Sequence, residues 1–209
     1  SSGKMGFAVA HEASRRGARV TLIAGPTTLP PPPVTELVRV RNAQQMRDAV
    51  MARVETADVV VMAAAVADYA PATREEQKIS KTAGAMTLEL TRTPDILAAV
   101  GAWRSERKAR VPVIVGFAAE TREVVARARQ KLMAKGADFI VANDVLQPGA
   151  GFEVDTNVVT LVGPDWQDAL PLQQKTLVAA SILDRVEQLI AGTPDRVSEP
   201  ASAKTGPER

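Results

Sequence analysis

The stretch VVVMAAAVADYAPATREEQKISK, at positions 59–81, constrains the fold of this chain more than any other. Its first part is apolar and small, too short to span a membrane and of the right length for a buried strand. The chain then passes through alanines and Asp68 into Pro71 and a lysine-bearing segment. In open α/β sheets, ligands bind beyond the carboxyl ends of the strands. We therefore expect a buried strand from Val59 that ends at a ligand site.

Segments typical of strands and helices alternate along the rest of the chain. Expected strands are 18–25, 37–41, 111–121 and 137–145, and expected helices are 7–17, 42–54, 93–105, 121–136 and 173–191. Asn42, Thr93 and Thr121 are candidate N-caps, with Pro94 at a first helical position and Gly136 at a helix end. Only 3% of the residues are aromatic, so the core consists of aliphatic side chains. This pattern predicts an α/β, Rossmann-like three-layer sandwich with a mostly parallel sheet.

Three segments depart from this alternation. MTLEL, at 86–90, is amphipathic with period two and lies between a strand and a helix, which indicates a protruding β-arm that reaches a second subunit. Residues 152–164 resemble an edge strand with a bulge at Asp-Thr-Asn. Residues 192–209 have the composition of a disordered tail. We therefore expect one domain over 1–191.

Composition excludes several classes of function. The 26 basic and 24 acidic residues nearly balance, so nothing points to a nucleic-acid or membrane partner. The absence of cysteine excludes disulfides, a thiol nucleophile and zinc-thiolate sites. One histidine, His11, excludes a multi-histidine metal site within one chain. No signal peptide or membrane span is recognisable, so a cytoplasmic location is expected. A first residue of Ser1 suggests a fragment or processed form.

Three polar positions around the expected site allow both a functional and an ordinary interpretation. Asp68 could hold Mg²⁺ or a ribose hydroxyl, or it could simply bond its own backbone in a turn. Lys78 and Lys81 could belong to a lid that carries an ammonium group to a polyphosphate, or to a solvated charged loop.

A second set of candidates lies in the second half of the chain. Lys131 and Lys135 share one helix face, which Arg127 extends by a turn; such a basic stripe binds anions or serves solubility. Phe117, at the end of a buried strand, either belongs to the core or packs on a planar base.

Glycine motifs give weaker signals. SSGKMG, at 1–6, resembles the end of a phosphate-binding loop, with Gly3 at a helix N-terminus, although the full P-loop pattern is absent and a plain helix cap is an alternative. The G-x-G-x-x-G fingerprint is absent, which counts against a dinucleotide-dependent dehydrogenase. A Rossmann-type NAD(P) oxidoreductase and a non-catalytic α/β dimerisation module remain as alternative functions.

Several separated motifs together resemble the phosphopantothenate–cysteine ligase family, the synthetase half of the bacterial bifunctional coenzyme A protein. In chain order they are SSGKMGFAVA, AAAVADYAP, EEQKISK, TRTPDIL, VGFAAET, ARQKLMAKGADFIVANDV and GFEVDTN. The resemblance implies a ligase that activates 4′-phosphopantothenate with CTP. An acyl-cytidylate forms, and L-cysteine attacks it to give 4′-phosphopantothenoylcysteine, CMP and pyrophosphate. It also implies a Mg²⁺ requirement and a homodimer in which an extended element reaches the partner's site.

The resemblance also assigns roles to individual residues. It implies a catalytic Lys78 on a flap, and a CTP site formed by Met62, Ala64, Ala65, Asp68, Lys78, Pro94, Asp95, Ile96, Leu97, Phe117, Lys131 and Lys135. The metal ligands are not implied, apart from Asp68 as a candidate. Three departures stand out: the family's asparagine before SSGKMG is absent, KISK replaces a KxKK-type flap, and the FMN-dependent decarboxylase half is missing.

Overall fold

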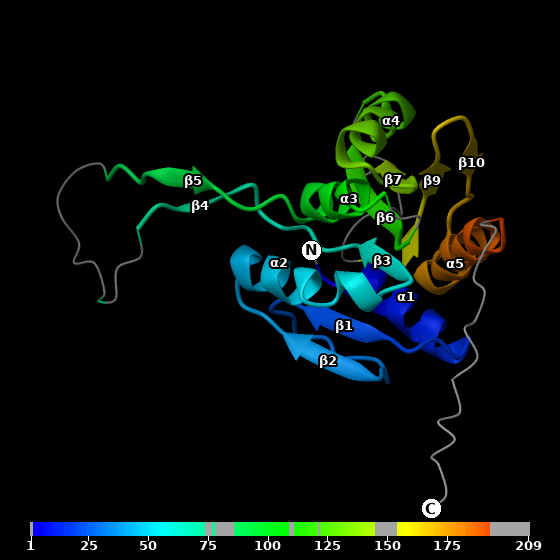
Figure 1. Cartoon of the computed structure of the whole chain (residues 1–209), viewed down its shortest axis with the longest axis horizontal. Helices are drawn as coiled ribbons and strands as arrows, with labels where there is room; N and C mark the ends of the chain where they lie inside the picture. Colours follow the sequence, from blue (N-terminus) through cyan, green and yellow to red (C-terminus); the bar gives the residue numbers. More distant parts are fainter. Residues whose placement is uncertain are drawn as a thin grey trace, which may run out of the picture.

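The computed structural model describes residues 2–73, 77, 86–108, 111–120, 122–144 and 154–192. Its central layer is a five-stranded sheet in the order β10-β9-β7-β6-β3 (Figure 1). Its strands are β3 (Val59–Met62), β6 (Val113–Glu120), β7 (Phe139–Asp144), β9 (Val159–Val162) and β10 (Gln167–Ala169). The first three are parallel to one another, and β9 and β10 are antiparallel to their neighbours. The expected α/β class with a mixed, mostly parallel sheet is confirmed.

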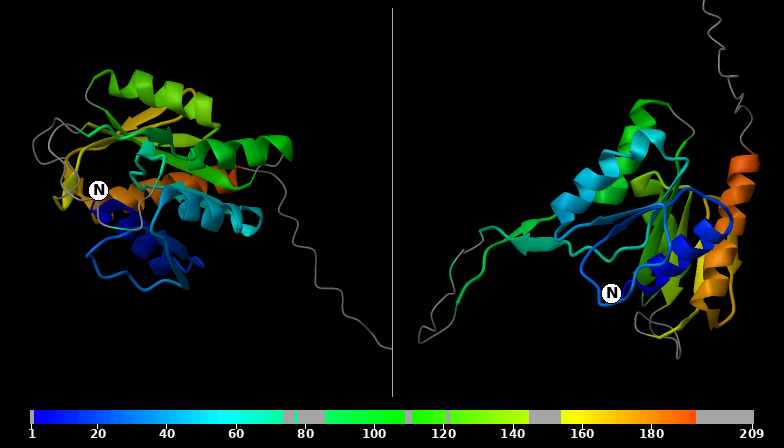
Figure 2. Two further views of the ribbon diagram at one scale, coloured as in Figure 1. Left: turned by 90° about the vertical axis from the view of Figure 1, so that its left-hand side faces the viewer. Right: turned by 90° about the horizontal axis from the view of Figure 1, so that it is seen from below.

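Helices cover both faces of this sheet (Figure 2). One apolar cluster joins β6 to α2 (Ala43–Met51), α3 (Ile96–Glu106) and α4 (Val124–Lys135). A second cluster joins it to α1 (Lys4–Arg15) and α5 (Lys175–Ala191), which pack against each other. Ile114 belongs to the first cluster and Val115 to the second, because successive strand residues point to opposite faces.

The sheet is not continuous, contrary to the sequence-based expectation. Strands β1 (Thr21–Ala24) and β2 (Glu36–Arg39) pair in parallel with each other and form a separate two-stranded sheet. As a result β3 lies at the edge of the central sheet, and all four of its residues are only half-buried. The prediction of a fully buried strand from Val59 is therefore wrong, since one edge of that strand has no neighbour in the described part of the chain.

The prediction of an edge strand over 152–164 is also wrong. Within the described part of that range, β9 is flanked on both sides, because a turn at Gly163 returns the chain as β10. The Gly163 amide donates to the Trp166 carbonyl at 2.9 Å, and the indole ring lies where a Cβ at Gly163 would be, 2.1 Å from that position. The preceding β8 (Thr156–Asn157) pairs instead with β11 (Gln173–Gln174) in a separate ribbon.

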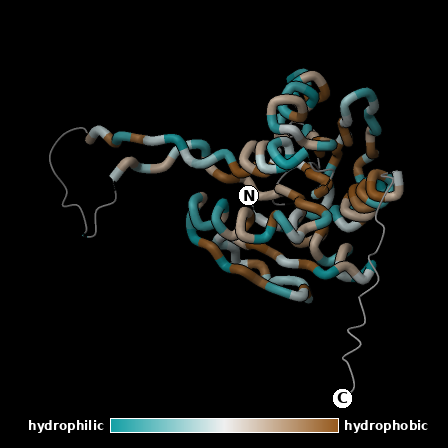
Figure 3. The backbone as a smooth tube through the Cα atoms, in the orientation of Figure 1, coloured by the Kyte–Doolittle hydropathy of each residue, from teal (hydrophilic) through white to brown (hydrophobic). Residues whose placement is uncertain are grey.

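The expected arm is present and protrudes from the body of the molecule (Figure 1). It consists of β4 (Tyr69–Pro71) and β5 (Leu90–Arg92), which pair antiparallel. The second strand thus begins at Leu90 and not at Met86 as predicted. Met86, Leu88 and Leu90 are 66%, 56% and 51% exposed, so these apolar side chains have no cover within the described chain. Figure 3 shows hydrophobic and hydrophilic positions interspersed along the arm.

The expected helix ends are partly confirmed. Asn42 caps α2 by accepting from the Gln45 amide at 2.8 Å, and Gly136 ends α4 with φ of 61°. Thr93 is not a cap: its hydroxyl donates to the Ala67 carbonyl at 2.5 Å, which ties the base of the arm together. Asp95 caps α3 instead, so Pro94 precedes the cap and the prediction that it is a first helical residue is wrong. Glu123 precedes α4. The predicted cap Thr121 and the predicted tail from 193 onward lie outside the described residues.

None of the described helices is long and apolar enough to cross a bilayer.

Helices α1 and α5 are joined by charged side chains. Arg16, the C-cap residue of α1, pairs with Glu12 of α1 at 2.8 Å and with Asp184 and Glu187 of α5 at 2.8 and 2.9 Å. Glu12 also accepts from Arg15, so this carboxylate joins two guanidinium groups at the helix interface.

We expect this network to make unfolding sensitive to acid. Hydrogen bonds from Arg15 and then Arg16 lower the pKa of Glu12 from 4.5 to about 2. Because the folded-state pKa is depressed, the stabilisation is complete above pH 4.5 and is lost as the pH falls toward 2. Between pH 5 and 2 the Tm should therefore fall less in Glu12→Gln than in the unaltered chain. Glu55→Gln, at an exposed position, is the control and should behave like the unaltered chain; equal falls in all three would contradict the role of Glu12.

Candidate functional site

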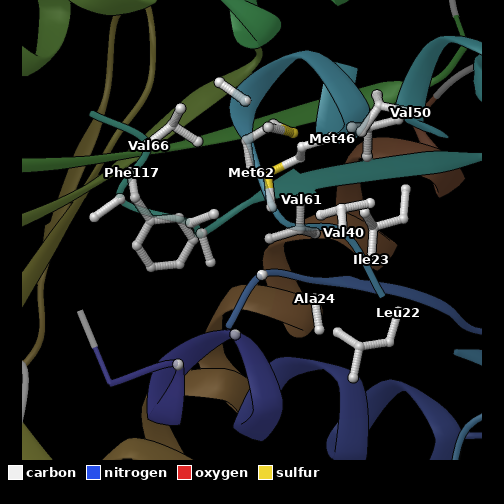
Figure 4. A pocket seen from close by; sticks show the side chains of 18 of the residues that line it. Leu22, Ile23, Ala24, Val40, Met46, Val50, Val61, Met62, Val66 and Phe117 are labelled. Carbon is white, nitrogen blue, oxygen red and sulfur yellow. The ribbon is translucent and has the colours of Figure 1, made fainter. Parts of the chain in front are cut away.

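A cavity of about 2360 Å³ runs along β1 and β3 and extends to the residues beyond their carboxyl ends. It is larger than the roughly 300–1,000 Å³ of ordinary ligand pockets, and it has two parts. The first, which we call the strand slot, is apolar and lies between β1 and β3 (Figure 4). The second, the carboxyl-end pocket, is bordered by the residues that follow β3, the base of the arm, the end of β6 and the N-terminus of α1.

The floor of the carboxyl-end pocket consists of small residues after β3. Met62, Ala64 and Ala65, which the resemblance assigns to the nucleotide, line this cavity. A Cβ placed on Gly6 would lie 3.5 Å from the Cβ of Ala63, so the first turn of α1 packs closely against this segment. Asp68 follows at the base of the arm, where it is exposed and also lines the cavity. Small side chains leave backbone amides accessible to a ligand at this point.

The predicted residues before and within α3 divide into two groups. Pro94 lines the cavity. Asp95 accepts from the Ala98 amide at 2.9 Å and from Lys135 Nζ at 2.5 Å. Burial raises the pKa of Asp95, but the hydrogen bonds from Lys135 and the amide outweigh it and leave that pKa below its ordinary value. Ile96 and Leu97 are 3% and 8% exposed and belong to the core, so only their backbone could meet a ligand.

The three basic side chains predicted to form a stripe on α4 each contact a different group. Lys131 Nζ donates to the Phe117 carbonyl at 2.8 Å, and both residues line the cavity. Lys135 is paired with Asp95, and Arg127 lies 3.5 Å from Glu120. Lys131 is therefore the member of the stripe that faces the cavity. Phe117 is only partly buried, so its ring borders both the core and the pocket (Figure 4).

Sequence reasoning missed a polar group beside the N-terminus of α1. Asn143, Asn157 and Lys175 are 7%, 4% and 5% exposed and line the cavity. Asn143 Oδ1 is buried and lacks a hydrogen-bond partner in the described chain. In the sequence, the expected strand 137–145 ends in two polar residues, Asn143 and Asp144, and this was the signal available.

Two lysines, Lys4 and Lys175, lie at the polar end of the cavity, the part beside the N-terminus of α1. Lys4, in the first turn of α1, pairs with Asp155 at 2.7 Å and lowers the pKa of that carboxyl. Lys175 Nζ donates to the Val154 carbonyl. Desolvation by burial lowers the pKa of Lys175, the charge of Lys4 lowers it further, and Asp155 opposes both. Two ammonium groups and a helix N-terminus thus meet at this end of the cavity, an arrangement that favours an anion.

Lys78, the predicted catalytic residue, lies outside the described residues; its sequence neighbour Gln77 lines the cavity. The described residues contain no cluster of three or more acidic or histidine side chains that would form a metal site. Mg²⁺ is commonly held by one or two carboxylates together with substrate phosphates. Asp68 in the cavity wall fits that type of site and not an all-protein cage.

Comparison with known proteins places the chain in one family. The model of the family "DNA/pantothenate metabolism flavoprotein C-terminal domain" matches residues 1–190. A coenzyme A biosynthesis bifunctional protein CoaBC from Vibrio vulnificus (strain YJ016) is 45% identical over 91% of this chain and 47% of its own length. The chain thus spans about half the length of that relative.

Two solved structures have the same fold. The C-terminal domain of a CoaBC protein matches with a TM-score of 0.75 and 38% identity, over 92% of this chain and 85% of that one. A Cab2 mutant in complex with phosphopantothenate-cysteine matches with a TM-score of 0.70, over 91% of this chain and 80% of that one; its 16% identity bears on the fold alone. The chain therefore belongs to the DNA/pantothenate metabolism flavoprotein C-terminal domain family and is homologous to the ligase part of the bacterial CoaBC proteins.

Proposed function

We propose that this domain joins 4′-phosphopantothenate to L-cysteine with CTP, through an acyl-cytidylate. Support comes from one observation above all. In a domain of this family, a single cavity is lined by Met62, Asp68, Pro94, Phe117 and Lys131, which come from separate elements of the fold. The resemblance had assigned each of these residues to the nucleotide. In the parent polypeptide, we propose, the domain works beside an FMN-dependent decarboxylase, in the cytoplasm.

The chemistry requires a poor acyl donor to become a good one. A carboxylate would have to expel an oxide, whereas the acyl-cytidylate expels CMP when the cysteine amine attacks. In the first step, negative charge develops on the departing pyrophosphate, and cations or amide donors aimed there lower the barrier. Lys131 lines the cavity beside Phe117 and, within the described chain, is a cation suited to this role at the predicted nucleotide residues.

Mg²⁺ would be held by Asp68 and the triphosphate, and it would neutralise part of that charge. The polar end beside α1 suits the phosphate of the acid substrate, since Lys4 and Lys175 lie there with the helix N-terminus. The reacting carboxyl would then face the α-phosphate across the alanine floor. This arrangement assigns the two anionic substrates to opposite sides of one pocket.

A homodimer is part of the same proposal. The arm carries an apolar row, Met86, Leu88 and Leu90, that the described chain leaves exposed. A two-stranded ribbon is marginally stable on its own. An exposed apolar row on such a ribbon suits packing against a second copy of the chain. Because the arm starts at the pocket wall, the partner would then lie next to the site (Figure 1).

Nucleotide binding is tested by the thermal stability of this chain with Mg²⁺ and each of CTP, ATP, GTP and UTP. A ligand that binds only the folded state at 100 times its Kd stabilises by about 2.7 kcal/mol. For a domain of this size, that corresponds to a rise in Tm of roughly 5–10 °C. We expect this rise with CTP. No rise with any nucleotide would favour a non-catalytic module, and a rise with NADPH alone would favour an oxidoreductase.

Lys131→Ala should weaken CTP binding by about tenfold, as expected for loss of one charged hydrogen bond. Titration calorimetry with CTP measures the change. Arg127→Ala is the matched control, because this residue lies one turn earlier on α4 and pairs with Glu120; its Kd should be unchanged. Equal affinity of Lys131→Ala and the unaltered chain would mean that the ammonium group serves only its bond to Phe117.

A further inference from the structure

Asp68 lies in the wall of the carboxyl-end pocket without a partner for its side chain. The residue is exposed and lines the cavity, yet within the described chain its carboxylate accepts no hydrogen bond and joins no ion pair. Its position therefore depends on how the backbone on either side is held. We propose that Thr93 sets this position and so acts as a positioning residue for the Mg²⁺–nucleotide ligand. This inference rests on the function proposed above, in which Asp68 meets that ligand.

Two hydrogen bonds from Thr93 hold the chain on both sides of the Asp68 Cα. The Thr93 hydroxyl donates to the Ala67 carbonyl at 2.5 Å, and the Thr93 amide donates to the Asp68 carbonyl at 3.0 Å. These carbonyls belong to the two planar peptide groups that flank the Asp68 Cα, and rotation about that atom is the freedom left to the backbone there. A single residue of the opposite strand thus restrains both rotations that aim the carboxylate.

The hydroxyl bond reinforces the weakest place of the arm. In the β4–β5 register Tyr69 pairs with Arg92, so Asp68 and Thr93 form the next pair, at the end of the ladder where the arm meets the body. A two-stranded ribbon is marginally stable, and its terminal pairs open most easily. The amide bond alone would therefore hold Asp68 loosely. The hydroxyl of Thr93 supplies a second bond that ordinary strand pairing does not provide.

Thr93 is itself fixed to the body of the domain. Pro94 follows it and restricts the backbone through its ring. Asp95 comes next and caps α3, where it also accepts from Lys135 of α4 at 2.5 Å. The position of Asp68 is thus set by α3 and α4, and not by the protruding arm alone. Mg²⁺ requires near-ideal octahedral geometry, so a displaced carboxylate would lose the ion before the domain lost its fold.

Titration calorimetry with CTP at a series of Mg²⁺ concentrations tests the proposal. Thr93→Val keeps the shape of the side chain and removes the hydroxyl. It should raise the Mg²⁺ concentration that gives half of the full CTP affinity by about tenfold, as for loss of one supporting hydrogen bond. Binding of CTP in the presence of EDTA should change much less. Thr93→Ser keeps the hydroxyl and should behave like the unaltered chain.

Thr35→Val is the matched control. The Thr35 hydroxyl also bonds distant backbone, since it accepts from the Val20 amide at 3.1 Å, but Thr35 does not line the cavity. This variant should leave the Mg²⁺ dependence unchanged even if its Tm falls. An equal change of Mg²⁺ dependence in Thr35→Val and Thr93→Val would reduce the effect to general destabilisation and overturn the proposal.

A double-mutant cycle shows whether Thr93 acts through Asp68. Asp68→Asn removes the charge that the metal ion would meet, so Thr93→Val should add little to the Mg²⁺ dependence of the Asp68→Asn chain. Effects that multiply independently would overturn the positioning role. So would an unchanged Mg²⁺ dependence in Thr93→Val while CTP still binds, an outcome that leaves the proposed ligase function intact.

Backbone hydrogen exchange supplies a readout that needs no nucleotide. In Thr93→Val, protection of the amide at position 93 should fall by about tenfold, because the end of the ladder opens more often. The Ala72 amide, which donates to the Glu89 carbonyl at 3.0 Å farther along the arm, is the internal control and should change less. Unchanged protection at position 93 would overturn the proposal whatever the titrations show. If the unaltered chain binds no CTP, the proposed function fails, and exchange still decides whether Thr93 holds Asp68.

Discussion

Replacing Lys78 by glutamine should slow turnover of the full-length parent by on the order of 10²-fold, the low end of the range for one charge-stabilising donor. Glutamine keeps length and hydrogen-bonding capacity but removes the charge. At about 4 Å from a phosphate oxygen, an ammonium group gains only ~1 kcal/mol in water but about 4 kcal/mol at an effective dielectric of ~20. The size of the effect therefore depends on closure of the pocket, which would also protect the acyl-cytidylate from water.

Pyrophosphate release at saturating CTP, 4′-phosphopantothenate and cysteine measures the effect. Lys108→Gln is the matched control, because Lys108 is an exposed lysine just after α3 and away from the cavity lining; its rate should equal that of the unaltered enzyme. The Kd for CTP should change less than the rate in Lys78→Gln, since Lys131 remains. A parent enzyme with Lys78→Gln and a near-normal rate would refute the catalytic role.

Local patterns in the sequence were sufficient for much of the fold. Hydrophobic periodicity located the five long helices and strands β1, β2, β3, β6 and β7 to within a few residues, but it did not predict β4, β10 or β11. Asn42 and Gly136 were correctly identified as helix ends. Such signals are local, because a cap or an amphipathic face depends on residues a few positions apart. The arm was predicted for the same reason: a period-two segment stood where the alternation of strands and helices required none.

What the sequence did not reveal depends on contacts between distant segments. Nothing in the VVVM run distinguishes a central strand from an edge strand, so the half-burial of β3 was not foreseen. The Thr93 hydroxyl donates to the carbonyl of Ala67, 26 positions away. Thr93 therefore does not cap α3, as its local sequence had predicted. Likewise Lys175 and Asn143, 32 positions apart in the chain, line one cavity only in the folded structure. Lys135 looked like Lys131 in the sequence, yet its partner Asp95 lies on another element.

Gly101 is a further residue whose role only the structure reveals, and replacing it should have the largest effect on stability. It lies within α3, where sequence rules count glycine as a simple weakness. In the structure a Cβ at this position would lie 2.0 Å from the Lys135 carbonyl oxygen and 3.4 Å from Gly136 Cα. The obstacle is the backbone at the end of α4, which a rotamer change cannot move away.

Gly101→Ala should therefore force α3 and α4 apart, although alanine is the better helix former. We expect a loss of about 3 kcal/mol of unfolding free energy, the upper part of the usual range for overpacking. The corresponding fall in Tm is roughly 6–12 °C. Thermal unfolding followed by circular dichroism measures it. Separation of the helices would also strain the Lys135–Asp95 ion pair, which spans the same contact at 2.5 Å.

Gly6→Ala is the matched control, since it is the same substitution inside another helix. Here the added methyl would lie 3.5 Å from the Ala63 Cβ, an ordinary van der Waals contact. Relief of glycine's conformational entropy should then stabilise the chain by about 0.5–1 kcal/mol. The two variants should thus shift Tm in opposite directions. If Gly101→Ala were also neutral or stabilising, helix propensity would outweigh the contact, and α3 and α4 would not be held at the distance that places Pro94 and Lys131 in one cavity.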